Sequence, residues 1–327
     1  MSRKVQAKKL VYICLVLILV LVMLFSGLQI LESIVRSRDP EPVGEVSSVT
    51  IERDGVEYFP RQDITVMLLM GIDEYGPVKA SESYNNTGEA DMVALAIFDE
   101  TNQKIDVLCL NRDTMLEMPA LGLGGKNAGT AFGQLALSHT YGTGLKDSCE
   151  NTLKTVSDFL YGVKINYYVS MNMDAIAILN DAVGGVTVNV TEDFSDVDET
   201  ITQGEITLKG QQAIHYVQVR KDVGDQKNIS RMERQKAYMK GFVEAFKQAN
   251  QEENFVLNTY ESVSDYIVTN FTTKSISATM NQYKDYALGE VITPEGENKL
   301  DGEHYEFYAD EQALDALILR LLYAPKN

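Results

Sequence analysis

The chain has 327 residues, of which 45% are hydrophobic, and carries 47 acidic against 29 basic side chains for a formal net charge of −18. This length suffices for a full hydrophobic core. The first nine residues hold four positive charges and no acid, so the remainder bears −22 and repels nucleic acid. Since no basic stripe, zinc-finger spacing or basic recognition helix occurs, we expect no nucleic-acid partner.

Residues 10–31 form a run of 22 residues without a charge. A helix of this length extends roughly 33 Å and crosses a bilayer. A cleaved signal peptide is the alternative, although the apolar run is long for one. Arg3, Lys4, Lys8 and Lys9 precede the run, so the positive-inside rule places residues 1–9 in the cytoplasm. The prediction is a single-pass cell-membrane protein whose chain after about residue 35 is extracellular.

Residues 32–61 are polar and Pro-containing, which predicts a juxtamembrane stalk with a short hairpin around Asp54-Gly55. The body then begins with three apolar runs at residues 64–71, 92–98 and 104–110, which predict strands. Short strands followed by helices favour an α/β (α+β) fold, with a central mixed β-sheet flanked by helices.

The middle of the chain predicts alternating elements. A glycine-rich stretch at 122–133 indicates a mobile loop, and a helix is expected over 147–161, ended by Gly162. Strand, helix and strand patterns over 165–170, 173–183 and 186–190 are typical of a βαβ unit.

Further elements are predicted toward the C-terminus. They are a β segment at 204–210, a short helix at 211–216, a strand at 217–220 and a long helix from Ser230 to about Ala249. Ser230 and Glu233 form a capping box at the start of that helix. The main domain is expected over 62–250, with residues 251–327 as a helical extension packed on it.

The three cysteines do not imply a disulfide framework. Cys14 lies in the predicted span, Cys109 in a predicted buried strand and Cys149 at the start of a helix. A bridge between Cys109 and Cys149 and two free buried thiols both stay open.

The strand over 104–110 ends in Asn111-Arg112-Asp113-Thr114. In open α/β sheets, ligands bind beyond the carboxyl ends of the strands, so Arg112 and Asp113 are candidates for a site. A salt bridge that closes the strand is the structural alternative.

Other polar residues also stand at the ends of predicted elements. They are Asp73, Asp91, His139, Arg220, Arg231, Arg234 and Gln235. Arg231 and Gln235 are four residues apart and share one helix face, where the helix N-terminal amides favour a phosphate. A solvated helix face is the alternative.

These residues occur in stretches that resemble the LytR-CpsA-Psr family of membrane-anchored cell-wall enzymes, over roughly residues 64–249. The matching stretches are VMLLMGIDE, GEADMVALAIFDE, KIDVLCLNRDT, LSHTYG, LYGVKINYYVSMNMDAIAILNDAVGGVTVNV, LKGQQAIHYVQVRKD and SRMERQ. The resemblance implies a phosphotransferase that moves a glycopolymer from an undecaprenyl pyrophosphate carrier to peptidoglycan. Its expected partners are this polyprenyl-linked glycopolymer, peptidoglycan and membrane lipid.

The resemblance also implies roles for individual residues. Asp73 and Asp91 would hold Mg²⁺ (or Mn²⁺), and Asp113 would orient Arg112 or help deprotonate the acceptor hydroxyl. The pyrophosphate would be gripped by Arg112, Arg220, Arg231 and Gln235, with Gln218 on the same strand as Arg220. Phosphoryl transfer depends mainly on positioning and charge neutralisation, which carboxylate-held Mg²⁺ and bidentate arginines provide.

The sequence departs from the family pattern at four places. Asn111 stands where a Pro is usual, Glu89-Ala90 where a basic residue and Ser precede Asp91, Gln218 where a first Arg is common, and Ala136 in place of a basic residue. A non-catalytic module that binds polyprenyl phosphates or glycans is therefore the second hypothesis. The older family name of transcriptional attenuator gives a third, which the topology and charge oppose. A polyprenyl groove near Phe159 and residues 176–179 cannot be distinguished from ordinary core by pattern.

Overall fold

The computed structural model describes residues 50–122, 125–219 and 223, part of residues 234–249, and residues 255–326 with short gaps. Its centre is a six-stranded mixed sheet with the order β11-β8-β3-β4-β5-β12. The strands are β3 (Ile64–Ile72), β4 (Ala90–Asp99), β5 (Lys104–Leu110), β8 (Tyr167–Met171), β11 (Ile267–Thr269) and β12 (Ala287–Ile292). β4 is antiparallel to both neighbours, whereas β8 is parallel to β3 and β12 is parallel to β5. The predicted central mixed sheet is confirmed.

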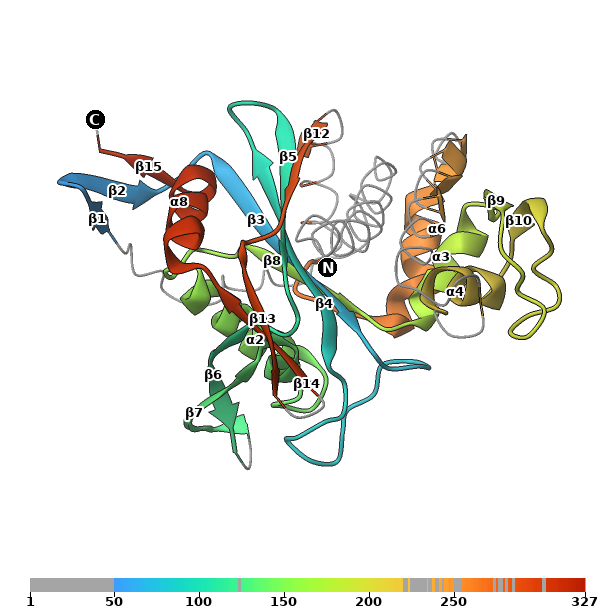
Figure 1. The fold of residues 1–327 in the computed structure, drawn as a ribbon, viewed down its shortest axis with the longest axis horizontal. Coiled ribbons are helices and arrows are strands. Elements are labelled where there is room, and N and C mark those ends of the chain that lie inside the picture. Colours follow the sequence, from blue (N-terminus) through green and yellow to red (C-terminus); the bar gives the residue numbers. More distant parts are fainter. Residues whose placement is uncertain are drawn as a thin grey trace.

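Both faces of the sheet are covered, which explains why β5 is apolar at every position except Lys104 and Asp106. Ile105, Val107 and Cys109 face one core, while Leu108 and Leu110 face the other. The first core includes residues of α3 (Asp174–Ala182), α4 (Gln211–Gln218) and α6 (Phe255–Val263), and the second includes residues of α2 (Lys146–Phe159) and α8 (Glu311–Leu322). Figure 1 shows α2 and α8 on one side of the sheet and α3, α4 and α6 on the other.

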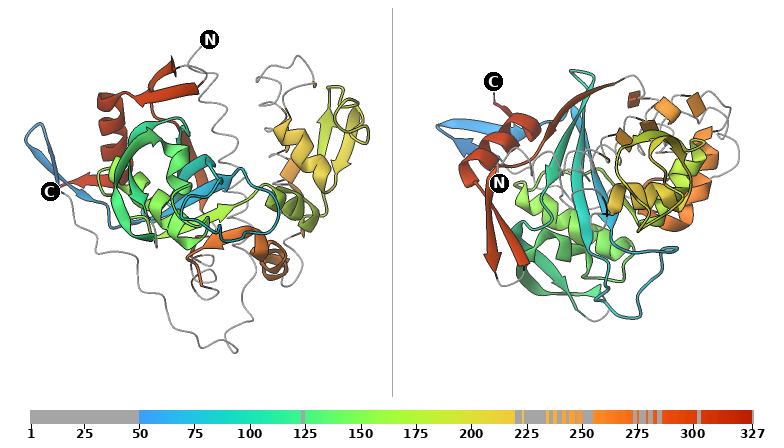
Figure 2. Two further views of the ribbon diagram at one scale, coloured as in Figure 1. Left: turned by 90° about the horizontal axis from the view of Figure 1, so that it is seen from below. Right: turned by 45° about the vertical axis from the view of Figure 1, so that its right-hand side comes forward.

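The chain between β8 and the C-terminal third departs from the predicted βαβ unit. β9 (Val186–Val190) pairs antiparallel with β10 (Gly204–Leu208) in a separate two-stranded sheet. These strands lie beside α3 and α4 on one side of the central sheet (Figures 1 and 2). In β9, buried valines alternate with exposed Thr187 and Asn189, as expected for a sheet with one covered face. This alternation is visible in the sequence and is not typical of the central strand of a βαβ unit. The strand predicted over 217–220 is also wrong at its start, because α4 continues to Gln218.

The glycine-rich stretch is largely a β-hairpin and not a mobile loop. β6 (Met115–Leu121) pairs with β7 (Asn127–Gln134), and η2, a 3₁₀-helix over Leu135–His139, follows directly. Glycines weaken a strand but are accommodated here because the partner strand supplies the pairing, as at Leu116 opposite Gly133.

The N-terminal hairpin is confirmed, but it belongs to the body. β1 (Ile51–Arg53) pairs with β2 (Val56–Pro60) around Asp54 and Gly55, which both have positive φ. β2 also pairs with β15 (Tyr323–Pro325) near the C-terminus. The boundary predicted at residue 61 is therefore too late, since residues 51–60 are part of the folded body.

The prediction of a helical extension over 251–327 is wrong for much of its length. Beside α6, the 3₁₀-helix η3 (Ser264–Tyr266) and α8, this segment holds β11, β12, β15 and the hairpin of β13 (Gly296–Asp301) and β14 (His304–Ala309). The pairing of β12 with β5 joins residues more than 180 positions apart. Such long-range pairing overrides local helical preference.

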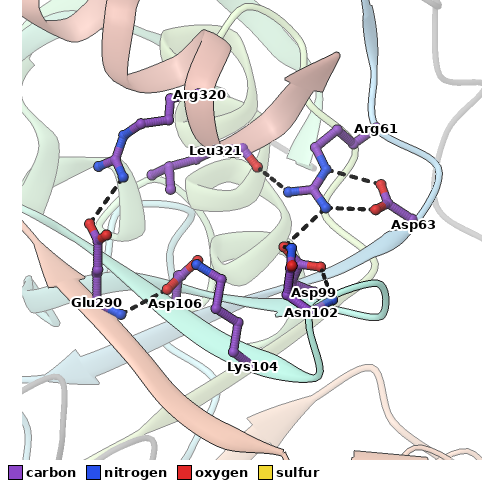
Figure 3. A network of polar contacts seen from close by, with 9 residues as sticks. All are labelled: Arg61, Asp63, Asp99, Asn102, Lys104, Asp106, Glu290, Arg320 and Leu321. Atoms are coloured by element: carbon purple, nitrogen blue, oxygen red, sulfur yellow. Dashed lines mark hydrogen bonds and ion pairs between the residues drawn. The ribbon is translucent and has the colours of Figure 1, made fainter.

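A polar network fastens the C-terminal segment to the end of the sheet where β4 turns into β5 (Figure 3). Arg61 forms ion pairs with Asp63 and Asp99, and its guanidinium also reaches the Leu321 carbonyl. Glu290 of β12 pairs with Arg320 of α8 at 3.0 Å. The carboxyl ends of β3 and β5, which carry the candidate site residues, lie at the opposite end of these strands.

Some predictions fall outside the described residues. They are the membrane span at 10–31, the tail at 1–9, most of the stalk and the capping box at Ser230 and Glu233. Among the helices that the structure describes, none has the length and hydrophobicity needed to cross a bilayer. Cys109 and Cys149 are both buried thiols, and the bridge between them is not formed.

Candidate active site

Three strand ends bring the predicted residues together. Because β4 runs antiparallel to β3 and β5, the start of β4 lies beside the carboxyl ends of its two neighbours. Asp73 directly follows β3, Asp91 is the second residue of β4, and Arg112 comes two residues after β5. The structure thus places three of the predicted residues at neighbouring strand ends, where ligands bind in open α/β sheets.

A β-bulge presents Asp91 at this edge. Gly71 is paired with Met92 and Ile72 with Ala90, which leaves Asp91 without an opposite residue on β3. The Asp91 amide donates instead to the carbonyl of Glu89 at 3.0 Å. An extra residue of this kind redirects a side chain, and here the Asp91 carboxylate is exposed next to Arg112.

The guanidinium of Arg112 is surrounded by carboxylates. Its Nη2 donates to Glu89 at 2.5 Å, its Nη1 to Asp91, and its Nε lies 3.4 Å from Asp113. The salt bridge considered from sequence therefore exists, but it is a cluster of four side chains and not a single pair. Its members remain accessible, with 30% of the Arg112 side chain and 44% of the Asp91 side chain exposed.

Electrostatics at the cluster are dominated by negative charge. Burial raises the pKa of Asp91, Arg112 opposes this rise, and the neighbouring charges of Asp73, Glu89 and Asp113 add to it. Burial also raises the pKa of Asp113, again against the effect of Arg112. Three carboxylates on one guanidinium, with the charge of Asp73 near Asp91, create a field that attracts a divalent cation.

The turn that carries Arg112 and Asp113 is held by hydrogen bonds from several elements. The Asn111 side-chain oxygen accepts from the Asp113 amide at 3.0 Å, an Asx turn in the place where the family has Pro. The amide of Ala136 donates to the Arg112 carbonyl at 3.0 Å. From β14, the Phe307 amide donates to the Asp113 carbonyl at 2.8 Å. These bonds fix the backbone so that the two side chains project together.

Two neighbours of the site were not among the residues predicted for it. Glu89 appeared only as a departure from the family pattern, although its position two residues before Asp91 was a usable signal. Gln134 ends β7, and its side-chain amide donates to the Asp113 carboxylate at 3.2 Å. The sequence carried no signal for Gln134, because the hairpin that returns it to Asp113 was expected to be a loop.

His139 is buried and contacts the segment that leads into the site, but it does not line the site. Its imidazole is 2% exposed, and Nδ1 bonds the Gly88 carbonyl at 2.8 Å. Burial lowers the pKa of His139, so the ring is neutral and carries its proton on Nδ1. The histidine thereby ties η2 to the segment that leads into Glu89 and Asp91.

Arg234 is likewise structural. Its side chain is 4% exposed, and its guanidinium donates to Glu192 and to the carbonyls of Tyr216 and Val219. These bonds fasten the end of α4, where Gln218 accepts a hydrogen bond from the Tyr75 hydroxyl at 2.9 Å. Gln218 thus contacts the segment after β3, close in sequence to Asp73. Arg220, Arg231 and Gln235 lie outside the described residues.

The described residues offer few ligands for a divalent cation. Among the residues that the structure describes, no three His, Cys, Asp or Glu side chains form a group that could hold a metal ion. Mg²⁺, however, is often bound by only one or two carboxylates, with water and substrate phosphates completing its shell. Asp73 and Asp91 lie at adjacent strand ends and are the candidates for such a pair.

The sequence profile of the LytR_cpsA_psr family matches residues 35–320. The chain belongs to this family. The resemblance inferred from the motifs is therefore confirmed over a longer stretch than the motifs themselves covered.

Relatives and solved structures agree with this assignment. A Bacillus licheniformis protein named polyisoprenyl-teichoic acid–peptidoglycan teichoic acid transferase TagU is 26% identical over 273 residues, 83% of this chain and 81% of that protein. A protein of the same name from Enterococcus faecalis is 28% identical over 225 residues, 69% of this chain and 67% of that protein. The structure of protein gbs0355 from Streptococcus agalactiae has a TM-score of 0.60 at 22% identity, covering 79% of this chain and 86% of that one. At this identity the structural similarity establishes the fold.

Proposed function

We propose that this protein is an extracytoplasmic, Mg²⁺-dependent phosphotransferase that transfers a glycopolymer from undecaprenyl pyrophosphate to peptidoglycan. The predicted N-terminal span would anchor it in the cell membrane, with the folded body outside. The names of the TagU relatives support transfer of a polyisoprenyl-linked polymer to peptidoglycan. The observation that carries the proposal is the cluster of Asp73, Asp91, Arg112 and Asp113 at adjacent strand ends.

The proposed reaction is a displacement at phosphorus. A hydroxyl oxygen of peptidoglycan forms a bond to the phosphorus that carries the glycopolymer. The bond from that phosphorus to the bridging oxygen of the pyrophosphate breaks, and undecaprenyl phosphate leaves. The hydroxyl proton passes to a base and then to solvent, and the product is a phosphodiester between the two polymers.

Each described residue has a role in this proposal. Asp73 and Asp91 would hold Mg²⁺, which neutralises charge on the pyrophosphate when bound. Arg112 binds a phosphate oxygen through its guanidinium. The carboxylate of Asp113 has a raised pKa, which brings it nearer to the range of a general base, and Gln134 orients it. Arg220, Arg231, Gln235 and Gln218 remain predicted pyrophosphate ligands.

The test uses the purified full-length chain in detergent with Mg²⁺, a polyprenyl-pyrophosphate oligosaccharide and peptidoglycan fragments. We expect release of polyprenyl phosphate and a phosphodiester-linked product. Arg112→Ala should lower the rate at least about 100-fold, because one charged phosphate contact in an active site is worth roughly 3 kcal/mol. Arg320→Ala is the matched control, since it removes an arginine with one carboxylate partner at the opposite edge of the sheet.

The second candidate is a module that binds the same lipid without turnover. It is favoured by Gln218, which stands where an arginine is common and bonds Tyr75. In that case the lipid would bind and the wild type and Arg112→Ala would be equally inert. Gain of activity in Gln218→Arg would favour the enzyme.

A further inference from the structure

The Glu89 carboxylate accepts a hydrogen bond from Nη2 of Arg112, a donor that a phosphate would need. The Nη2 of Arg112 donates to Glu89 at 2.5 Å, while Nη1 donates to Asp91 and Nε faces Asp113. All three nitrogens of the guanidinium are thus directed at protein carboxylates. Among the described residues, the Glu89 carboxylate bonds only Arg112.

This arrangement opposes the binding of a bare anion. Arg112 with Glu89, Asp91 and Asp113 has a formal charge of −2, and Asp73 beside Asp91 makes the local charge more negative. A pyrophosphate must displace at least one carboxylate from Arg112 and approach the others. Both steps cost free energy, because like charges repel and the displaced carboxylate loses its partner.

A divalent cation would change this balance through Asp91 and not through Glu89. When Asp73 and Asp91 turn to a cation, Nη1 of Arg112 is released and two negative charges are neutralised. Nη1 is then open to the phosphate, so Glu89 on Nη2 hinders phosphate binding less when the cation is bound than when it is absent. The 38% exposure of the Glu89 side chain leaves room for it to move aside.

We propose that Glu89 is a specificity-determining residue that makes pyrophosphate binding at Arg112 conditional on a divalent cation bound first. This inference rests on the proposed function, since it assumes that Arg112 receives a pyrophosphate. It goes beyond that function by setting an order of binding and by assigning the order to one side chain. The opposite role, in which Glu89 holds Arg112 in the orientation that the phosphate needs, makes the contrary prediction.

The experiment measures equilibrium binding of inorganic pyrophosphate to the full-length chain in detergent by titration calorimetry. Each protein is titrated once with EDTA and once with Mg²⁺ in excess over pyrophosphate. The variants are Glu89→Gln, which keeps the side-chain shape without the charge, and Glu290→Gln. The latter is a matched control because Glu290 also pairs with an arginine, at 3.0 Å, but at the opposite edge of the sheet. Thermal unfolding of each variant confirms that it is folded.

For Glu89→Gln we expect affinity in EDTA to rise about tenfold, as removal of one nearby charge at a half-exposed site predicts. Affinity with Mg²⁺ should change by less than about threefold, so the enhancement by Mg²⁺ shrinks. Glu290→Gln should match the wild type in both titrations. Unchanged affinity of Glu89→Gln in EDTA would overturn the inference. So would an equal fall in both titrations, which would assign Glu89 an orienting role.

The outcome also separates this inference from the proposed function. If the wild type binds pyrophosphate with Mg²⁺ but Glu89→Gln has no effect in EDTA, only the ordering role of Glu89 fails. If the wild type binds no pyrophosphate even with Mg²⁺, the phosphate site itself is wrong, and both proposals fall.

Discussion

Arg234 allows the sharpest test of a structural role against a functional one. The sequence made Arg234 a possible site residue, whereas the structure buries it. Its Nε donates to the Tyr216 carbonyl at 2.9 Å, its Nη1 to Glu192 at 2.8 Å, and its guanidinium stacks 5.3 Å from the centre of the Phe194 ring. A substitution here should therefore reduce stability first.

The perturbation is Arg234→Met, which fills a similar volume without charge. It leaves the Glu192 carboxylate, 15% exposed, without its partner and removes the donor to the Tyr216 carbonyl. Breaking a buried ion pair by removing one member costs about 3–5 kcal/mol, and the residual exposure of Glu192 moves the expectation to about 2–4 kcal/mol. Since whole domains are stable by about 5–15 kcal/mol, the change is large.

The assay is urea unfolding of the full-length chain followed by far-UV circular dichroism. Arg320→Met is the control, because Arg320 is 51% exposed and its ion pair should contribute less than about 1 kcal/mol. Adding Glu192→Gln to Arg234→Met should recover part of the loss, since no buried charge then remains unpaired. An unchanged unfolding midpoint together with lost pyrophosphate binding would refute the structural role and restore the prediction made from sequence.

Three further results are expected. The pKa of Asp91 is raised in the folded state, so its negative charge lowers stability at neutral pH, and this effect disappears as the pH falls through that pKa. Without divalent cations, Asp91→Asn should therefore raise the melting temperature at pH 7 but not near pH 4. His139→Leu should lower the free energy of unfolding in a urea titration by about 1–3 kcal/mol, because the Gly88 carbonyl loses its buried donor. Cys109 and Cys149 should react with maleimide only after unfolding, since both are buried and burial raises the pKa of Cys149 to about 12. Labelling of either thiol in the folded protein would contradict this packing.

The central strands and the key arginine could be predicted because their signals are local. The run over 104–110 is apolar at every position except Lys104 and Asp106, which indicates burial on both faces, and the polar cluster follows immediately. Asp91 next to a second apolar run gave the same kind of signal. The general rule on strand ends then brought these residues to one edge without knowledge of the pairing.

The C-terminal third could not be predicted because its structure depends on distant partners. Residues 287–292 become a strand by pairing with β5, and residues 323–325 by pairing with β2. Neither segment has a strong strand pattern of its own. The same cause hid Gln134, whose contact with Asp113 depends on the β6–β7 hairpin formed across a glycine-rich sequence.

The geometry of the site follows from a backbone irregularity and not from side chains alone. In a regular pairing of β3 with β4, Asp91 would face a residue of β3, and its side-chain direction would follow the alternation of the strand. The bulge removes that constraint, and the Asp91 amide is satisfied by the Glu89 carbonyl. The same carbonyl accepts from the Asp73 amide at 3.1 Å, so one backbone group holds both predicted metal-binding residues. The Glu89 carbonyl therefore links the backbones of Asp73 and Asp91, and the Glu89 side chain restrains Arg112. Glu89 thus contacts three of the four residues on which the proposed function rests.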